Sequence, residues 1–115
     1  MPDHIARFLA AFAFAAGATA ASAQQWPAKP VRVVVPFAPG GGADFMGRLT
    51  GQHMTAALGQ PMVVENRVGA SGIIGYDYGL KAAPDGYTVT VVSTTYSILP
   101  SLYKLTYDPI KDMQP

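Results

Sequence analysis

The sequence predicts an α/β fold with a parallel sheet, and three features carry this prediction. Short apolar or β-branched runs at residues 31–35, 62–65 and 87–92 are typical of buried strands. Helical patterns at about 44–58 and 71–83 separate these runs, and the connections between them are short. A β-α-β-α-β order with short connections implies parallel strands joined by right-handed crossovers.

The first predicted strand, Val31–Val35, ends where a loop rich in proline and glycine begins. Proline cannot donate to a strand ladder, and glycine permits positive φ. A helix from about Asp44 to Leu58 is expected next, with Gly59 as its terminator. At 100° per residue, apolar side chains gather on one face of this helix, which we expect to be its packing face. These side chains belong to Phe45, Met46, Leu49, Ala56 and Ala57.

The second predicted helix, from about Ser71 to Ala83, follows the strand 62–65 and a turn-rich loop. Three glycines weaken it by about 1 kcal/mol each relative to alanine, so it needs tertiary packing, and they allow close approach to a sheet. The glycines are Gly72, Gly75 and Gly79, and the shared apolar face is Ile73, Tyr76, Leu80 and Ala83. A third strand, Tyr87 to Val92, and a short helix near Leu99 to Tyr103 complete the pattern.

Composition excludes several classes of function. The 115 residues are 50% hydrophobic and 13% charged, which suits one small globular unit. The absence of cysteine excludes disulfides and thiolate metal sites, and two histidines alone do not make a structural zinc site. The net charge is only +1 and the charges are scattered, which disfavours nucleic-acid binding. No nucleophile–base constellation is recognisable, so we expect no catalytic residues, no metal and no cofactor.

The first 23 residues have the pattern of a cleaved secretory signal peptide. An arginine, Arg7, precedes an apolar run from Phe8 to Ala16, and small residues end at Ala21-Ser22-Ala23. The run is shorter than the roughly 20 residues that a membrane-spanning helix needs. We therefore expect cleavage after Ala23 and a mature chain that does not span a membrane.

Three loops reach the carboxyl edge of the predicted sheet, where ligands of open α/β sheets bind. They are residues 37–43, 66–71 and 93–96. In the first loop three glycines precede a helix N-terminus, whose unpartnered N–H groups and dipole suit an anion. A carboxylate and a phosphate fit this argument equally, and the alternative is that the glycines only make a tight turn. The loop lacks the lysine of a Walker A motif and the third glycine of a dinucleotide fingerprint, which disfavours nucleotide binding.

Side chains near these loops have two interpretations each. The hydroxyls of Ser93, Thr94 and Thr95 could donate to a carboxylate or could cap the following turn. Asp44 is interpreted as a helix N-cap in preference to a ligand contact.

Two further polar side chains are assigned structural roles. His53 falls within the apolar stripe of the first helix, and we expect it to be packed rather than catalytic. Arg67 could meet a ligand carboxylate, but the nearby Glu65 favours a surface ion pair.

Several motifs in a fixed order resemble the Bug family of periplasmic solute-binding proteins, the receptors of tripartite tricarboxylate transporters. The likeness covers essentially all of the mature chain. The motifs are Trp26-Pro27-Ala28-Lys29-Pro30-Val31-Arg32, the run from Val33 to Gly41, Leu58-Gly59-Gln60-Pro61, Val63-Val64-Glu65-Asn66-Arg67, Gly69-Ala70-Ser71-Gly72, Ala82-Ala83-Pro84-Asp85-Gly86-Tyr87-Thr88 and Tyr107-Asp108-Pro109.

The resemblance implies a two-domain "Venus flytrap" with a ligand cleft between its domains. The family pattern P-F-x-P-G-G-x-x-D is matched in full by the residues from Pro36 to Asp44, and family members hold a ligand carboxylate with this loop, partly through backbone groups and ordered water. The ligand-binding residues implied in this way are Phe37, Ala38, Pro39, Gly40, Gly41, Gly42, Ala43, Asp44, Ser71, Ser93, Thr94 and Thr95. Tyr96 is bulkier than expected beside the cleft, and Tyr76, Tyr78 and Gly79 depart from the usual alanine-rich second helix.

Family members are much longer than this chain, so residues 24–115 are interpreted as an incomplete N-terminal domain with apolar surface left uncovered. The implied function is capture of a small carboxylate (a di- or tricarboxylate, an aromatic acid or an acidic amino acid) in the periplasm, for delivery to membrane permease subunits. It is not enzymatic. The alternatives are a truncated, non-functional remnant and, less favoured, a phosphate- or nucleotide-binding enzyme domain.

Overall fold

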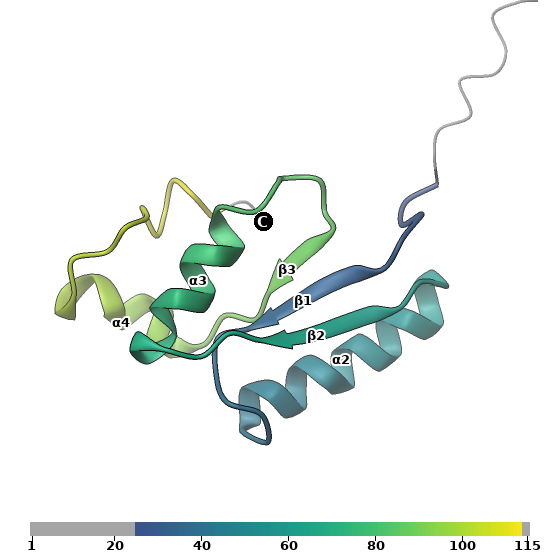
Figure 1. Ribbon diagram of the computed structural model, residues 1–115, viewed down its shortest axis with the longest axis horizontal. Coiled ribbons are helices and arrows are strands. Elements are labelled where there is room, and N and C mark those ends of the chain that lie inside the picture. Colours follow the sequence, from purple (N-terminus) through teal and green to yellow (C-terminus); the bar gives the residue numbers. More distant parts are fainter. Residues whose placement is uncertain (1–24, 114–115) are drawn as a thin grey trace, which may run out of the picture.

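The computed structural model describes residues 25–113, so the predicted signal peptide at 1–23 lies outside the described residues. Within that range the predicted α/β fold with parallel strands is confirmed (Figure 1). The elements in chain order are β1 (Val31–Val35), α2 (Gly42–Leu58), β2 (Met62–Asn66), the 3-10 helix η1 (Ala70–Gly72), α3 (Ile73–Leu80), β3 (Thr88–Thr90) and α4 (Thr94–Leu102).

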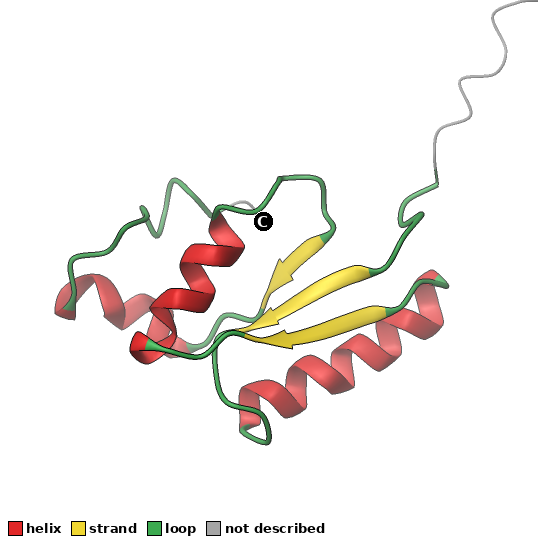
Figure 2. Ribbon diagram, in the orientation of Figure 1, coloured by secondary structure: helices red, strands yellow, loops and turns green. Residues whose placement is uncertain are grey.

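The sheet has the strand order β2-β1-β3, and β1 pairs in parallel with both neighbours. Val35, the last residue of β1, is in register with Asn66, the last residue of β2. The α2 and α3 helices cover opposite faces of the sheet, because the adjacent residues Val91 and Thr90 point to opposite faces and contact α2 and α3 respectively. Figure 2 shows this arrangement, with one helix on either side of the strands.

The packing face of α2 differs from the predicted one. The helix places Gly47 and Gly51 against the sheet, where a Cβ on Gly47 would lie 3.0 Å from Val35 Cγ2. The apolar stripe expected to be buried faces outward instead: Phe45 is 63% exposed and Met46 55% exposed. Leu49, Ala56 and Ala57 are exposed as well. Glycine lets the helix backbone approach the strands closely, and this close packing overrides the apolar periodicity.

The glycines of α3 confirm the expected close approach to the sheet. A Cβ on Gly75 would lie 2.7 Å from Pro36 Cα, and one on Gly79 would overlap the Thr90 hydroxyl. The predicted face is confirmed in part: Tyr76 is buried, and Ile73 and Leu80 pack beside it. Ala83 lies beyond the end of the helix and is exposed.

An aromatic cluster forms the core between α3, α4 and the C-terminal segment. Tyr76 and Leu99 are each 1% exposed, and Tyr96 and Tyr107 are also buried. The rings of Tyr76 and Tyr96 meet edge-on at 5.0 Å, and those of Tyr96 and Tyr107 stack at 6.2 Å. Such contacts add stability beyond the burial of their area.

Two boundaries near the C-terminus differ from the prediction. The third strand covers only Thr88–Thr90, and the last helix begins at Thr94 instead of near Leu99. Pro100 lies inside this helix, and because proline lacks an N–H the sequence signal for a helix across it is weak. Among the helices of residues 25–113, none combines the length and the apolar character that crossing a bilayer requires.

Candidate functional site

The three predicted loops all follow the carboxyl ends of parallel strands. In the first, Ala38, Pro39 and Gly40 are exposed, as are Gly41 and Gly42, while Phe37 and Ala43 are half-buried. Gly40 has a φ of 86°, a left-handed conformation that favours glycine. This loop therefore presents backbone, with little side chain, at the start of α2.

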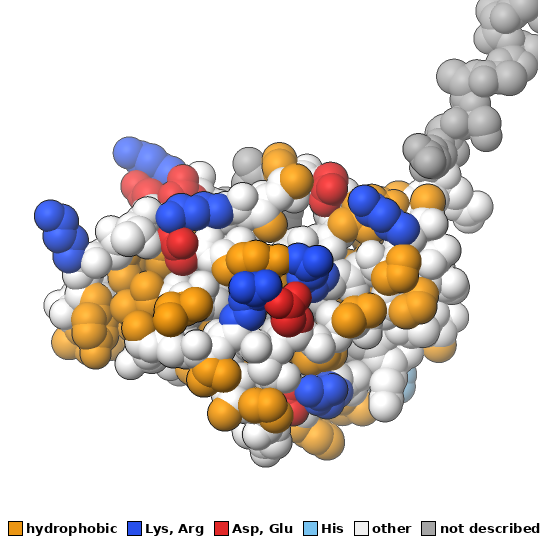
Figure 3. Space-filling view, in the orientation of Figure 1, with side chains coloured by type: hydrophobic (Ala, Val, Ile, Leu, Met, Phe, Trp, Pro, Cys, Tyr) orange, Lys and Arg blue, Asp and Glu red, His pale blue; other side chains and the backbone are white. Residues whose placement is uncertain are grey.

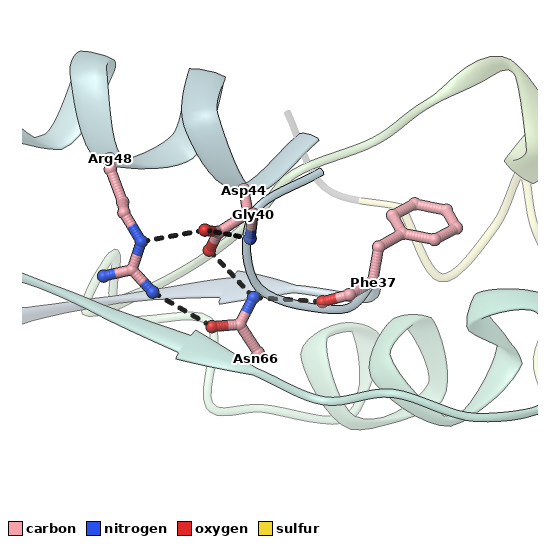
Figure 4. A network of polar contacts seen from close by, with 5 residues as sticks. All are labelled: Phe37, Gly40, Asp44, Arg48 and Asn66. Carbon is pink, nitrogen blue, oxygen red and sulfur yellow. Dashed lines mark hydrogen bonds and ion pairs between the residues drawn. The ribbon is translucent and has the colours of Figure 1, made fainter. Parts of the chain in front are cut away.

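A polar network fixes the first loop, residues 37–43, which we call the glycine loop (Figure 4). Asp44 Oδ2 accepts hydrogen bonds from the Gly40 N–H and from Arg48 Nε, both at 2.9 Å. Asp44 Oδ1 accepts from Asn66 Nδ2 at 2.9 Å, and the same nitrogen donates to the Phe37 carbonyl at 3.0 Å. Arg48 closes the network by donating to Asn66 Oδ1 at 3.2 Å. The network joins both ends of the loop to β2 and α2.

The charge of Asp44 is compensated within this network. The residue is 3% exposed, and donation from Arg48, from the Gly40 N–H and from Asn66 holds the pKa of its carboxyl well below the usual range. The same ion pair raises the pKa of Arg48. Asp44 is consequently ionised at neutral pH, and its contacts are intramolecular.

The interpretation of Asp44 as the N-cap is wrong in its detail. The N-cap position is occupied by Gly41, which makes no side-chain cap, and Asp44 is the third residue of α2. The carboxylate reaches back to the Gly40 N–H, in the manner of the acidic third residue of a capping box. Asp44 therefore stabilises the loop and the helix start together.

The start of α2 leaves backbone donors available. The first intrahelical bond runs from the Phe45 N–H to the Gly41 carbonyl at 2.9 Å. Within residues 25–113, the N–H groups of Gly42, Ala43 and Asp44 have no intramolecular acceptor. Such donors at a helix N-terminus favour an anion, because the helix dipole adds partial positive charge there.

Gly72, the residue that directly follows the second loop, packs on the first loop. A Cβ on Gly72 would lie 3.4 Å from Phe37 Cζ and 3.0 Å from Tyr76 Cε2. Ser71 precedes it, exposed and in a left-handed conformation with a φ of 57°. The structure thus places Ser71 next to a residue that packs directly on the glycine loop.

The third loop reaches the site through Ser93. Ser93 occupies the N-cap position of α4 without a side-chain cap bond, and its Oγ lies 3.1 Å from the Tyr76 hydroxyl. Thr94 and Thr95 lie in the first turn of α4, and no hydrogen bond within the described residues joins them to the glycine loop. Tyr96, which we expected beside the cleft, is instead a core residue whose hydroxyl donates to the Pro109 carbonyl at 2.8 Å.

Of the two remaining side-chain assignments, the structure contradicts that of His53 and confirms that of Arg67. His53 is exposed on α2, so the expectation that it is packed is wrong, since the whole stripe to which it belongs faces outward. The predicted ion pair of Arg67 with Glu65 is confirmed, with an N–O distance of 2.5 Å. Arg67 also lies over the Tyr78 ring at 3.6 Å.

Sequence reasoning missed Arg48 and Asn66 as parts of the site. The spacing of Asp44 and Arg48, four residues apart on a helix, signals an ion pair. Asn66 gives no local signal, because its role depends on the parallel register that places it beside Val35.

A hollow of the surface lies away from the glycine loop, and residues of β1 and α3 line it. Arg32, Arg67 and Tyr78 line it together with Asp77 and Lys81. Its basic groups are largely paired, as Arg32 and Arg67 both contact Glu65 and Lys81 contacts Asp77. The face shown in Figure 3 accordingly presents Lys and Arg side chains in small groups beside acidic ones.

Comparison with known proteins identifies relatives of one kind. The family described as "Tripartite tricarboxylate transporter family receptor" matches residues 46–115. Protein BugT of Bordetella pertussis is 44% identical over 94 residues, which are 76% of this chain and 29% of BugT. A UPF0065 protein of Cupriavidus necator is 37% identical over 109 residues, 95% of this chain and 33% of that relative.

Solved structures agree with these matches. The periplasmic binding protein BugD superposes with a TM-score of 0.73 at 42% identity, covering 76% of this chain and 29% of BugD. MatC from Rhodopseudomonas palustris with bound malate gives a TM-score of 0.69 at 41% identity, covering 76% and 30%. An R. palustris protein with adipate gives 0.69 at 36% identity, covering 73% and 29%.

These relatives are periplasmic solute-binding receptors, which are binding proteins and not enzymes. The chain spans about a third of the length of the curated relatives it matches, between 29% and 33% of the two named above.

Proposed function

Because this chain belongs to the tripartite tricarboxylate transporter receptor family, we propose that its glycine loop holds one carboxylate of a small ligand. In this proposal the chain forms part of the first domain of a periplasmic receptor, residues 1–23 direct its export, and membrane permease subunits receive the ligand. The ligand-binding residues are those of the three loops: Phe37, Ala38, Pro39, Gly40, Gly41, Gly42, Ala43, Asp44, Ser71, Ser93, Thr94 and Thr95.

The observation that supports this function most strongly is the set of unpartnered N–H groups of Gly42, Ala43 and Asp44 at the start of α2. They lie in an exposed loop without bulky side chains. A carboxylate oxygen can accept from such groups, and hydrogen bonds to a charged group contribute about 1.5–3 kcal/mol each.

The polar network supports the same function in two ways. It fixes the loop before a ligand arrives, which lowers the entropy cost of binding. It also pairs the Asp44 carboxylate with Arg48 at 2.9 Å, so that a ligand anion meets a compensated charge at this point. Asp44 thus serves the site as a support, with its oxygens occupied by Gly40, Arg48 and Asn66.

The ligand class follows from the relatives. MatC is solved with malate and an R. palustris protein with adipate, both small dicarboxylates. A dicarboxylate has one group for the glycine loop and a second for groups outside residues 25–113. We therefore propose a small carboxylate as the ligand class, with dicarboxylates as the first candidates.

Thermal unfolding of the chain with malate, adipate, benzoate and glutamate tests the proposal, with ATP as the phosphate comparison. At 100 times Kd a bound ligand stabilises the fold by about 2.7 kcal/mol, which shifts the melting temperature of a small domain by several degrees. A shift with carboxylates and none with ATP supports the function. A shift with ATP alone, or with no ligand in a well-folded protein, contradicts it.

A pair of variants locates the ligand at the loop. Gly42→Pro removes one backbone donor at the first helical position, where proline is tolerated, and Gly41 already has the extended conformation that precedes proline. Gly42→Ala keeps the N–H, and its Cβ meets nothing within 4 Å. We expect Gly42→Pro to weaken carboxylate binding about tenfold or more, as the loss of a hydrogen bond to a charged group implies, and Gly42→Ala to bind like the parent. Equal binding by both variants would place the ligand elsewhere.

A further inference from the structure

We propose that Tyr76 is a positioning residue of the binding site, which holds the Ser93 side chain so that its hydroxyl hydrogen is available to a ligand carboxylate. This inference rests on the proposed function and deepens it. Tyr76 belongs to α3, outside the three loops.

The geometry brings Tyr76 to all three loops. Its ring meets Phe37 of the glycine loop edge-on at 6.3 Å and lies against Gly72, which directly follows the second loop. Its hydroxyl lies 3.1 Å from Ser93 Oγ in the third loop. The residue is 1% exposed, and its ring also meets the Tyr96 ring edge-on at 5.0 Å. The position of the phenol oxygen is therefore fixed by packing.

The direction of the hydrogen bond follows from the donors and acceptors present. The Ser93 N–H donates to the phenol oxygen at 3.4 Å, so this oxygen already acts as an acceptor. Within the described residues, Ser93 Oγ is the one acceptor in reach of the buried phenol hydrogen. The contact is partly buried and its distance suits a bond in either direction. Leaving the phenol hydrogen without an acceptor costs free energy, so the donor is assigned to Tyr76 and the acceptor to Ser93 Oγ. The hydrogen of the Ser93 hydroxyl then remains free to donate to another oxygen.

This arrangement leaves the Ser93 hydroxyl to act as a hydrogen-bond donor toward a ligand. A serine at the surface rotates freely between donor and acceptor roles, whereas here one lone pair is occupied by Tyr76. A carboxylate accepts hydrogen bonds only, so a serine fixed as a donor is suited to it.

Binding of malate and adipate to four variants of the chain tests the inference by titration calorimetry. Tyr76→Phe removes the hydroxyl and keeps the ring, Ser93→Ala removes its partner, and the double variant removes both. Tyr96→Phe is the matched control, because it loses a hydroxyl from the same cluster that bonds the Pro109 carbonyl. We expect Tyr76→Phe to weaken binding about three- to tenfold, the size of one neutral hydrogen bond. Ser93→Ala should weaken binding at least as much, the double variant should match Ser93→Ala, and Tyr96→Phe should stay within twofold of the parent.

Whether the effects of Tyr76→Phe and Ser93→Ala on binding add in the double variant distinguishes a positioning role of Tyr76 from a merely structural one. Tyr76→Phe binding within twofold of the parent, or an undiminished effect of Tyr76→Phe in the Ser93→Ala background, would overturn the inference and leave the proposed function intact. Failure of the parent to bind either probe would instead overturn the proposed function, and the inference with it.

A ligand-free measurement by NMR accompanies the titrations. The Ser93 amide should shift and exchange faster in Tyr76→Phe but not in Tyr96→Phe, and an unchanged Ser93 amide would overturn the inference. Should Tyr76→Phe fold poorly, the Tyr76 ring resonances of Ser93→Ala give the converse readout, and their failure to shift would count equally against it.

Discussion

Asn66 Nδ2 lies 2.9 Å from Asp44 Oδ1, and this hydrogen bond ties the end of β2 to the first turn of α2. The same nitrogen donates to the Phe37 carbonyl, so one amide group serves both the carboxylate and the start of the glycine loop. A loop of glycines has little conformational preference of its own. Its order in this protein comes from the side chains behind it.

The first prediction concerns Asn66 itself. Asn66→Ala leaves Asp44 Oδ1 and the Phe37 carbonyl without this donor. Both contacts are partly buried, and an acceptor left unsatisfied in such a place costs about 1–3 kcal/mol. We expect the free energy of unfolding, measured with urea, to fall by about that amount or more. Gln52→Ala, at an exposed position on α2, should change it by less than about 0.5 kcal/mol. Equal effects of the two changes would contradict a stabilising role of the network.

The second prediction concerns the pH dependence of stability. The pKa of Asp44 in the folded protein is held well below its usual range by Arg48, Gly40 and Asn66. A folded-state pKa below the unfolded one contributes stability that is present above the unfolded pKa, near 4, and is lost as the pH falls toward the folded value.

The Asp44→Asn variant isolates this contribution, because Asp77 and Asp108 also have lowered pKa values and remain in both proteins. The variant should be less stable than the parent at pH 7, and the difference should shrink as the pH is lowered from 4 to 2. Urea unfolding at several pH values measures it. A difference that stays constant across this range would show that the Asp44 charge is not involved.

The third prediction compares two glycines. Gly75→Ala would place a Cβ 2.7 Å from Pro36 Cα and 2.8 Å from the Arg67 carbonyl oxygen, both backbone atoms that cannot easily move. Overpacking of this kind costs about 1–3 kcal/mol or more. Gly42→Ala meets nothing within 4 Å, and alanine is the better helix former by about 1 kcal/mol, so this variant should be as stable as the parent or more so. Thermal unfolding distinguishes the two, and a tolerated Gly75→Ala would show that α3 sits further from the sheet.

The sequence alone predicts the order and the type of the elements well, because their signals are local. The β-branched run Val31–Val35 forms a strand over its whole predicted length, and Gly59 ends α2 with a φ of 72° as expected. The place of the glycine loop follows in turn from the parallel topology. Helix starts are less well predicted, because α2 begins at Gly42 through the backbone of the loop itself and not through an N-cap side chain.

The contacts of the site could not be predicted, because they join residues that are distant in the sequence. Asn66 reaches Asp44 only through the strand register, and Tyr76 reaches Ser93 only through the packing of α3 on α4. The face of α2 that packs on the sheet was predicted wrongly for a related reason. Apolar periodicity weighs large side chains, whereas α2 meets the sheet with Gly47 and Gly51, which such a count ignores.

The fourth prediction tests whether the apolar stripe of α2 faces outward. Phe45 is 63% exposed, so Phe45→Ser should leave the free energy of unfolding nearly unchanged. Leu99, at 1% exposed, is the control: Leu99→Ala should cost about 2–5 kcal/mol through the cavity it leaves.

The outward stripe of Phe45, Met46 and Leu49 is an exposed apolar patch of the kind that promotes association or binds apolar dyes. Phe45→Ser should therefore lower 1-anilinonaphthalene-8-sulfonate fluorescence and self-association in sedimentation. A loss of stability in Phe45→Ser as large as that in Leu99→Ala would show that the stripe is buried in the core, as its apolar periodicity predicts.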